Sequence, residues 1–234
     1  AATPRIRLSQ KDPFGTITNN FNSTMVVAEY ARRERIPLFF AASSSTRFVH
    51  HQENPYTFSK CVNEEVLQLY HKEFGLEYHN LYFYNVYGPR EADYGEYSTV
   101  VRAFKKCVEN NEPLRIFGSG RKQRDFTHIH DVIDGILQLL TTKNKPKNVH
   151  LGTGNPVSIM DIAKAFDHDF IHEFDKKGEA EITECEKPYI DAQYDVIGYI
   201  KKWKSDFEEE RILHNVNKDL RKVEEKYAKI DSGQ

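Results

Sequence analysis

The sequence predicts an α/β fold in which helices cover both faces of a parallel sheet, with a smaller lobe at its C-terminal side. Helix-like and strand-like segments alternate up to about residue 166, and this order builds a parallel sheet. Short continuous apolar runs mark the strands, as expected for strands buried on both faces. The 234 residues exceed one typical domain of about 150 residues, which leaves room for the lobe.

The predicted elements follow in order along the chain. Apolar residues at helical spacing predict five helices, with Asn20 or Asn22 as a cap of the first: 20–33, 56–74, 98–110, 132–140 and 158–166. Strands are predicted at 36–42, 77–84, 114–117 and 148–151. The chain after residue 175 is highly charged with mixed signs, which predicts solvated helices.

Composition excludes several classes of protein. The 33 basic and 35 acidic residues give a net charge of −2, so nothing in the overall charge favours nucleic acid or anionic lipid. No apolar stretch approaches the roughly 18 residues of a membrane span. The three cysteines are too scattered for a disulfide framework or a metal cluster, and their odd number suits reduced thiols. We therefore expect a cytoplasmic protein without a metal, membrane or nucleic-acid partner.

Tyr56 and Lys60 are the first candidates for chemistry. They are four residues apart on a predicted helix, hence on one face and one turn apart. A neighbouring ammonium lowers a tyrosine pKa from its usual value of about 10, and such a pair can move the proton of a sugar hydroxyl. The chain has 13 tyrosines, so the spacing alone is uninformative. The context is Ser43, at the end of a predicted strand, whose hydroxyl can share a substrate oxygen with Tyr56.

Five motifs occur together in one order: Ala42-Ser43-Ser44-Ser45-Thr46, Tyr56-x-x-x-Lys60, Tyr84-Asn85-Val86-Tyr87-Gly88-Pro89-Arg90, Arg124-Asp125-Phe126-x-His128-x-x-Asp131 and Leu151-Gly152-Thr153-Gly154. From residue 1 to about residue 166, this pattern resembles the extended short-chain dehydrogenase/reductases, the NAD-dependent nucleotide-sugar epimerases and dehydratases. The resemblance implies a Rossmann-type doubly wound sheet with a smaller C-terminal substrate lobe.

The resemblance also implies roles at the reacting centre. Tyr56 is expected to be the acid/base. Lys60 is expected to bind the nicotinamide ribose and to lower the Tyr56 pKa. Ser43 would orient the sugar hydroxyl, with Ser44 beside it, and Asn20 would support the lysine from the preceding helix.

Further residues are expected along the cofactor and the substrate. Phe83 and Tyr84 would lie along the nicotinamide, and Asn85 near the sugar diphosphate. Arg124 would meet the phosphates, in keeping with seven basic and three acidic side chains over 100–125, since a guanidinium fork suits a diphosphate. The alternative for Arg124 is a surface arginine paired with Asp125.

The resemblance divides the chain into two parts. Residues 1–84 and 128–154 would belong to the dinucleotide-binding domain, and 85–127 and 155–234 mainly to the substrate lobe. The implied cofactor is NAD, with NADP left open. The implied partner is a nucleoside-diphosphate sugar, and the expected assembly is a homodimer.

The sequence also departs from the family pattern. The strand and glycine fingerprint that cradle the dinucleotide pyrophosphate are absent, so we expect about 65 to 75 family residues to precede Ala1. We expect the 234 residues alone to bind NAD(P) no tighter than about 1 mM and to show no epimerase activity. The gap of thirteen residues between Ser43 and Tyr56 is shorter than in extended members, and Arg47-Phe48 replaces the family's Tyr-Gly.

The remaining motifs indicate the reaction type. The 4,6-dehydratases of the family carry Asp-Glu where Ser44-Ser45 stand here, so epimerisation is favoured over dehydration. The segment after Gly88 looks most like bacterial UDP-sugar 4-epimerases and ADP-heptose 6-epimerases, although Tyr94 and its neighbours lack the second acid/base lysine of the heptose enzymes. Two alternatives stay open: a non-catalytic nucleotide-sugar-binding relative or truncated fragment, and a nucleotide-sugar reductase or dehydratase.

Overall fold

A computed structural model describes residues 2–93, 98–175 and 179–231, and for residues 45, 215 and 219–231 it describes the backbone alone. Its helices are α1 (Ile6–Lys11), α2 (Pro13–Glu34), α3 (Ser45–Phe48), α4 (Pro55–Phe74), α5 (Val100–Glu109), α6 (Ile129–Thr141), α7 (Ile159–Ala165) and α8 (Val196–Asp231). Its strands are β1 (Leu38–Ser43), β2 (Tyr78–Phe83), β3 (Val86–Tyr87), β4 (Leu114–Phe117), β5 (Gln123–Asp125), β6 (Thr127–His128), β7 (Asn148–Leu151), β8 (Pro156–Ser158), β9 (Phe170–Glu173) and β10 (Ile182–Thr183).

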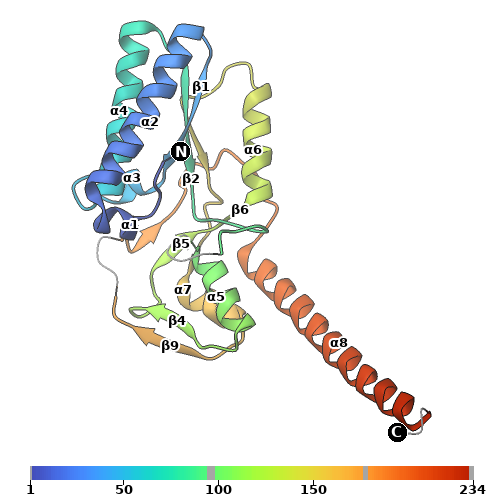
Figure 1. The fold of residues 1–234 in the computed structure, drawn as a ribbon. Helices are drawn as coiled ribbons and strands as arrows, with labels where there is room; N and C mark the ends of the chain where they lie inside the picture. The colour runs from blue at the N-terminus through green and yellow to red at the C-terminus, as the bar shows by residue number, and fades with distance from the viewer. Residues whose placement is uncertain (1, 94–97, 176–178, 232–234) are drawn as a thin grey trace.

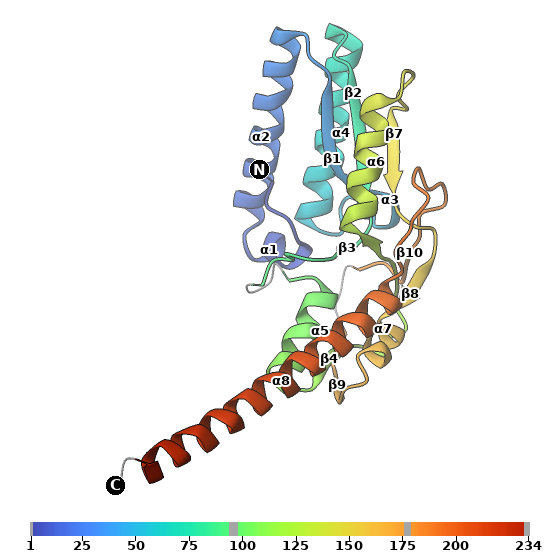
Figure 2. The same ribbon diagram turned by 90° about the vertical axis from the view of Figure 1, so that its right-hand side faces the viewer.

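The main sheet has the order β1-β2-β7 and is parallel throughout. Helices α2 and α4 cover one face and α6 covers the other, as Figures 1 and 2 show. The core divides accordingly. On one face, Ala28 of α2 and Leu67 of α4 pack with Tyr78 of β2. On the other face, Leu139 of α6 packs with Leu81 of β2. This arrangement is a doubly wound parallel sheet, which confirms the predicted fold class.

The helix ends follow local chemistry. In α4, the Asn54 side chain accepts a hydrogen bond from Thr57 N at 2.8 Å, Pro55 takes the first helical position, and Gly75 ends the helix with φ 71°. These signals are the usual start and stop of a helix, and the predicted helix 56–74 is confirmed. The predicted start of the first long helix at residue 20 is wrong. Asp12 caps α2 instead, and Asn20 lies within that helix.

A second group of elements packs around its own core. Strand β4 pairs with β9, and β5 lies between β10 and β8. Their apolar side chains join those of α5, α7 and the first turns of α8 in one cluster that includes Phe104, Ile116, Phe166 and Ile200. The rest of α8 extends away from this cluster (Figure 1). The predicted division between a dinucleotide-binding domain and a substrate lobe stays a prediction.

No helix in the described ranges combines the length and the apolar character that crossing a bilayer requires.

Candidate active site

Ser43 and Tyr56 meet at the carboxyl edge of the sheet. Ser43 is the last residue of β1 and lies beside Phe83 of β2. Tyr56 lies in the first turn of α4, where the Asn54 cap fixes how the chain enters the helix. The two side chains form a hydrogen bond. The structure therefore brings together the serine and the tyrosine that the sequence placed thirteen residues apart.

Burial raises the pKa of Tyr56 above its ordinary value of 10. The hydrogen bond from Ser43 and the positive charge of Arg5 both act in the opposite direction. The expectation that Lys60 lowers this pKa is therefore not met. One turn further along α4, the Lys60 ammonium is directed to the backbone of β1, and Arg5 supplies the charge near the phenol.

Lys60 is a buried cation, with 6% of its surface exposed. Its Nζ donates a hydrogen bond to Ala41 O at 2.9 Å and lies 5.1 Å from the ring centroid of Phe40. Burial lowers the pKa of Lys60 to about 8, and the negative charge of Glu64 opposes that shift. Glu64 lies one turn beyond Lys60 on the same helix. Tyr56, Lys60 and Glu64 therefore lie one turn apart along the same face of α4, and they place a phenol, a cation and an anion in that order.

We expect Lys60→Met to raise the free energy of unfolding by about 1–3 kcal/mol at pH 7. Below pH 8 the native protein buries a charged ammonium, whereas the unfolded chain keeps that charge in water. Between pH 8 and about 10.5 the unfolded chain binds the extra proton, so the wild type gains stability with rising pH and the advantage of the variant shrinks.

Urea unfolding at pH 7 and pH 10 measures this difference. The matched control is Lys201→Met, which removes an exposed lysine and is expected to change stability by less than about 0.5 kcal/mol at both values. A Lys60→Met effect that is the same at both pH values would show that burial of the charge is not what destabilises the native state.

Asn20 connects the N-terminal segment to α4. This fully buried side chain donates to Ser59 Oγ at 2.9 Å and to Thr3 O at 3.1 Å, and it accepts from Thr3 N at 2.6 Å. The backbone carbonyl oxygen of Asn20 accepts from Asn63 Nδ2 at 3.1 Å. Asn20 therefore fixes α4 on both sides of Lys60, and a direct role toward a cofactor stays a prediction.

Phe83 and Tyr84 lie in different clusters, because neighbouring residues of an extended strand alternate between its faces. Phe83 packs with Leu81 on the α6 side. Tyr84 is 2% exposed, packs with Cys185, and its hydroxyl lies 2.9 Å from His150 Nδ1. The two rings therefore have different surroundings, and their expected place along the nicotinamide stays a prediction for both.

Asn85 and Arg124 lie close together, as the motifs predict. Asn85 Nδ2 donates to the carbonyl oxygen of Asp125 at 3.1 Å. The Arg124 guanidinium donates to Glu179 Oε2 at 3.2 Å and to the carbonyl oxygens of Gln123 and Glu181. The alternative pairing of Arg124 with Asp125 is not what the structure shows, because the Asp125 carboxylate accepts from Thr153, Gly154 and Cys185.

Other cations of the basic segment 100–125 are also paired. Arg102 binds Asp93 and Glu109, Arg115 binds Glu173, and Lys122 binds Asp175. Glu109 within the segment and three acidic residues outside it therefore offset much of the positive charge that the sequence shows there. The Arg124 guanidinium is itself paired with the Glu179 carboxylate at 3.2 Å.

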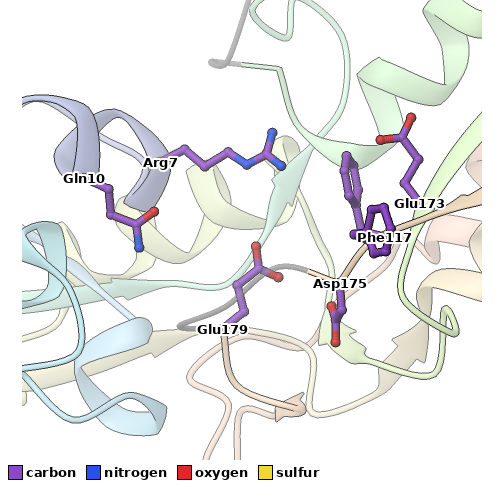
Figure 3. Close-up of a pocket in the computed structure, with 7 residues that line it drawn as sticks. Arg7, Gln10, Phe117, Glu173, Asp175 and Glu179 are labelled. Atoms are coloured by element: carbon purple, nitrogen blue, oxygen red, sulfur yellow. The ribbon is translucent and has the colours of Figure 1, made fainter.

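A cleft of about 360 Å³ lies beside this ion pair, between α1 and the β4–β9 pair, and Figure 3 shows its lining. The Arg7 guanidinium extends from α1 to within 5.0 Å of the Phe117 ring centroid. Three carboxylates also line the cleft, and each pairs with a cation: Glu173 with Arg115, Asp175 with Lys122, and Glu179 with Arg124. This acidic wall was not predicted from the sequence.

Three further residues near the centre were not predicted as site residues. Glu64 was detectable, because it continues the four-residue spacing of Tyr56 and Lys60. Arg47 pairs with Glu64 at 3.3 Å and lies 4.3 Å from the ring centroid of Tyr82, which explains one departure from the family pattern. Arg5 had no local signal. The tertiary packing of the N-terminal segment brings its charge near Tyr56. The backbone of Arg5 there has a positive φ of 81°.

Gly88 and Glu91 form the turn that follows β3. Glu91 Oε1 accepts a hydrogen bond from Gly88 N at 2.7 Å, and a Cβ on Gly88 would lie 2.7 Å from Ile129. Only glycine fits this close approach, at φ 142°. Tyr94, which bears on the heptose-epimerase alternative, lies outside the described residues. Within the described ranges, no group of three or more potential ligands is placed to hold a metal ion.

Comparisons with known proteins point to the same family as the sequence motifs. The model of the NAD dependent epimerase/dehydratase family matches residues 1–152. A Methanocaldococcus jannaschii protein assigned provisionally as a UDP-glucose 4-epimerase is 32% identical over 182 residues, which are 72% of this chain and 59% of that protein. The ADP-L-glycero-D-manno-heptose-6-epimerase of Alkalilimnicola ehrlichii is 27% identical over 163 residues, 63% of this chain and 51% of that enzyme. The chain thus spans between half and two thirds of these relatives.

Solved structures show the same fold. The UDP-glucose 4-epimerase of Thermotoga maritima superposes with a TM-score of 0.78 at 22% identity, covering 89% of this chain and 75% of that one. The UDP-glucuronic acid 4-epimerase of Bacillus cereus, solved with UDP-glucuronic acid and NAD, superposes with a TM-score of 0.72 at 26% identity, covering 87% and 74%. The family match extends over more than half of the 234 residues. The chain therefore belongs to the NAD-dependent epimerase/dehydratase family.

Proposed function

We propose that this protein is an NAD-dependent nucleotide-sugar epimerase. The observation that carries the proposal is the Ser43–Tyr56 hydrogen bond at the carboxyl edge of the sheet, with Lys60 one turn away. Ligands of open α/β sheets bind at this edge. Family membership supports the cofactor class, and the relatives with 4-epimerase and 6-epimerase names support the reaction class.

The residues present fit the nicotinamide-ribose end of NAD. A lysine ammonium has three N–H donors, and the contact described for Lys60 uses one of them, on Ala41 O. The remaining donors suit ribose hydroxyls. Phe83 supplies an apolar surface next to Ser43, its neighbour in the β1–β2 register. When bound, NAD would accept a hydride from the sugar carbon and return it to the opposite face.

Tyr56 would move the proton of the sugar hydroxyl. Because burial keeps the phenol protonated at neutral pH, the tyrosine is a ready donor in the direction that restores the hydroxyl. In the other direction its phenolate is stabilised by the Ser43 hydrogen bond and by the Arg5 charge. Ser43 would also accept or donate at the same sugar oxygen. Positions 44–46 carry hydroxyl side chains rather than carboxylates, which favours epimerisation over elimination of water.

Product analysis of the full-length gene product with a panel of UDP-, ADP- and GDP-sugars tests the proposal. Isomerisation without a net change in NADH is the expected result. Stoichiometric NADH formation or consumption would instead indicate a dehydrogenase or reductase. Binding of a nucleotide sugar without turnover would indicate a non-catalytic relative, and either result overturns the assignment as an epimerase.

A nucleoside diphosphate is expected to bind beside Asn85 and Arg124. We expect Arg124→Ala to weaken UDP binding about tenfold or more, because a charge-assisted contact to phosphate is lost. Glu179→Gln is expected to tighten binding severalfold, since the guanidinium no longer has to leave a carboxylate at 3.2 Å. Both affinities are measured by calorimetric titration at low and high salt, and wild-type affinity should fall as salt rises.

Arg121→Ala is the matched control for the Arg124 substitution. It removes the same charge three residues away, from an exposed position, and should change the affinity less than twofold. Equal losses in the two variants would mean that the diphosphate responds only to net charge. If UDP, ADP and GDP all bind no more tightly than inorganic phosphate, the nucleotide-sugar assignment fails.

The setting and assembly of the protein are part of the proposal. Cys61, Cys107 and Cys185 are all free thiols in the structure, which supports a reducing compartment such as the cytoplasm. The homodimer expected from the resemblance stays a prediction.

A further inference from the structure

The Glu64 carboxylate joins helix α4 to the short helix α3. Glu64 lies on α4 one turn after Lys60 and two turns after Tyr56, and its side chain is 16% exposed. Its Oε1 accepts a hydrogen bond from the Thr46 hydroxyl at 3.1 Å, and its Oε2 pairs with the Arg47 guanidinium at 3.3 Å. Both of these partners belong to α3. One carboxylate therefore fastens α3 to the helix that carries the tyrosine and the lysine.

A third donor reaches the same carboxylate from the sheet. The hydroxyl of Tyr82, on β2, donates to Glu64 Oε2 at 2.5 Å, and Tyr82 is fully buried. Arg47 also donates to this hydroxyl, and its guanidinium carbon lies 4.3 Å from the centroid of the Tyr82 ring. A carboxylate taken out of water is costly unless charge and hydrogen bonds compensate it. Donors from two elements supply that compensation, so the position of Glu64 is fixed.

The contacts of Tyr56 and of Glu64 close one unit of structure from its two ends. Ser43 ends β1, and its hydroxyl meets Tyr56 in the first turn of α4. Three residues later, the Thr46 hydroxyl donates to Ser43 O at 2.8 Å as well as to Glu64. Two turns of helix, about 11–12 Å, separate Tyr56 from Glu64. The placement of Ser43 against Tyr56 therefore depends on how α3 lies on α4.

We propose that Glu64 is a positioning residue of the candidate active site, whose contacts with α3 hold Ser43 where its hydroxyl meets Tyr56. The proposal rests on the proposed function, because Ser43 and Tyr56 are the pair assigned there to the sugar hydroxyl. Glu64 acts through Ser43 and not on the substrate. Its loss should therefore affect the chemical step more than the binding of the nucleotide.

The charge of Glu64 also acts on Lys60. It raises the pKa of Lys60 against the effect of burial, which brings that pKa to about 8. Without the carboxylate, burial is unopposed and the pKa of Lys60 falls further. The other titratable groups around these two residues are Tyr56, Cys61 and Glu65 of α4, Arg47 of α3, Tyr82 of β2, and His150 of β7, which stacks on Tyr82.

Steady-state kinetics of the full-length gene product test the positioning role. Glu64→Gln keeps the size of the side chain and is expected to lower kcat about tenfold, with KM for the nucleotide sugar changed less than twofold. The alkaline limb of the kcat/KM profile is expected to move to lower pH by about 0.5–1, because the Lys60 ammonium loses its proton more readily.

Glu65→Gln is the matched control. It removes the same charge from the next residue of α4, which is exposed, and should change kcat less than twofold at an unchanged pH profile. Equal effects of the two substitutions would mean that only net charge matters, and would overturn the proposal. A Glu64→Gln variant with the kcat and the pH profile of the wild type would overturn it as well.

Thr46 tests whether the effect of Glu64 passes through α3. Thr46→Val keeps the shape of the side chain without its hydroxyl, and is expected to lower kcat about three- to tenfold. Thr46→Ser keeps the hydroxyl and should recover most of that loss. The double variant Thr46→Val/Glu64→Gln should lose no more than Glu64→Gln alone, because both substitutions break one connection. Losses that multiply would show that Thr46 and Glu64 act independently, against the proposal.

Hydrogen exchange distinguishes failure of this proposal from failure of the proposed function, because it requires no turnover. Arg47 N donates to Ser44 O at 2.9 Å within α3, and Glu64→Gln should speed exchange of this amide at least tenfold. The reference is Gly75 N, which donates to His71 O at the far end of α4 and should not change. Unchanged exchange at Arg47 overturns the proposal, whatever reaction the protein catalyses. Faster exchange at Arg47 in a protein that converts no nucleotide sugar overturns the proposed function and supports the connection from Glu64 to α3.

Discussion

Replacement of Tyr56 by phenylalanine is expected to lower the turnover of a nucleotide sugar about 10²- to 10⁴-fold, with substrate affinity changed by no more than a few fold. The phenol hydroxyl is the group that would exchange a proton with the sugar, and the substitution removes it while keeping the ring. The hydrogen bond to Ser43 is lost at the same time. Steady-state kinetics and a binding titration on the active form of the protein separate the two effects.

Two further variants make this result interpretable. Tyr70→Phe, on the same helix but packed against Phe74, should leave turnover within twofold. Ser43→Ala should lower turnover by less than Tyr56→Phe does, because the acid/base group remains and only its partner is lost. Near-normal turnover in Tyr56→Phe would rule out the tyrosine as the acid/base, whatever its position at the edge of the sheet.

The main sheet was predictable because periodicity and local chemistry agree there. A continuous apolar run predicted β1, alternating residues predicted β2, and the regular order of helices and strands predicted a parallel sheet. Strands β4 and β7 begin and end at the predicted residues. The start of α2 was not predicted, because Asp12 and Pro13 precede a glycine and have little apolar periodicity. A capping bond from Gly15 N to Asp12 Oδ1 at 2.8 Å decided that boundary. Strands β9 and β10 were missed, since short exposed strands leave no periodic pattern.

The candidate site also contains some residues that the sequence predicts and others that it does not. Ser43, Tyr56 and Lys60 were predictable because each occupies a fixed place relative to one strand end and one helix face. The charge that acts on Tyr56 was not, since Arg5 reaches it through the tertiary packing of a segment about 50 residues away in sequence. The ion pairs of Arg115, Lys122 and Arg124 with Glu173, Asp175 and Glu179 were also invisible, because they join segments more than 50 residues apart.

Asp125 connects three segments that lie far apart in the sequence. This carboxylate is fully buried at the end of β5. Its Oδ1 accepts from Thr153 N at 2.9 Å and from Thr153 Oγ1 at 2.7 Å, and its Oδ2 accepts from Gly154 N at 2.8 Å and from Cys185 N at 2.9 Å. The backbone is closely packed beside it, since a Cβ on Gly152 would lie 2.5 Å from Cys185 Cβ. Four donors therefore depend on one carboxylate.

We expect Asp125→Asn to lower the free energy of unfolding by about 3–5 kcal/mol, and the melting temperature by about 10 °C. The amide keeps the size of the side chain, but its NH₂ group would face two of the backbone N–H donors and leave them buried without an acceptor. Hydrogen bonds to a charged group contribute about 1.5–3 kcal/mol each, so the loss of two accounts for this magnitude.

Urea unfolding measures the loss, with Asp134→Asn as the matched control. Asp134 is exposed on α6, and its replacement should change stability by less than about 0.5 kcal/mol. Because Asp125 neighbours Arg124, the variant should also bind UDP more weakly at a temperature where it is still folded. A loss of stability below about 1 kcal/mol would mean that the loop at Thr153 and Gly154 finds other acceptors, and that the carboxylate does not hold the arginine segment in place.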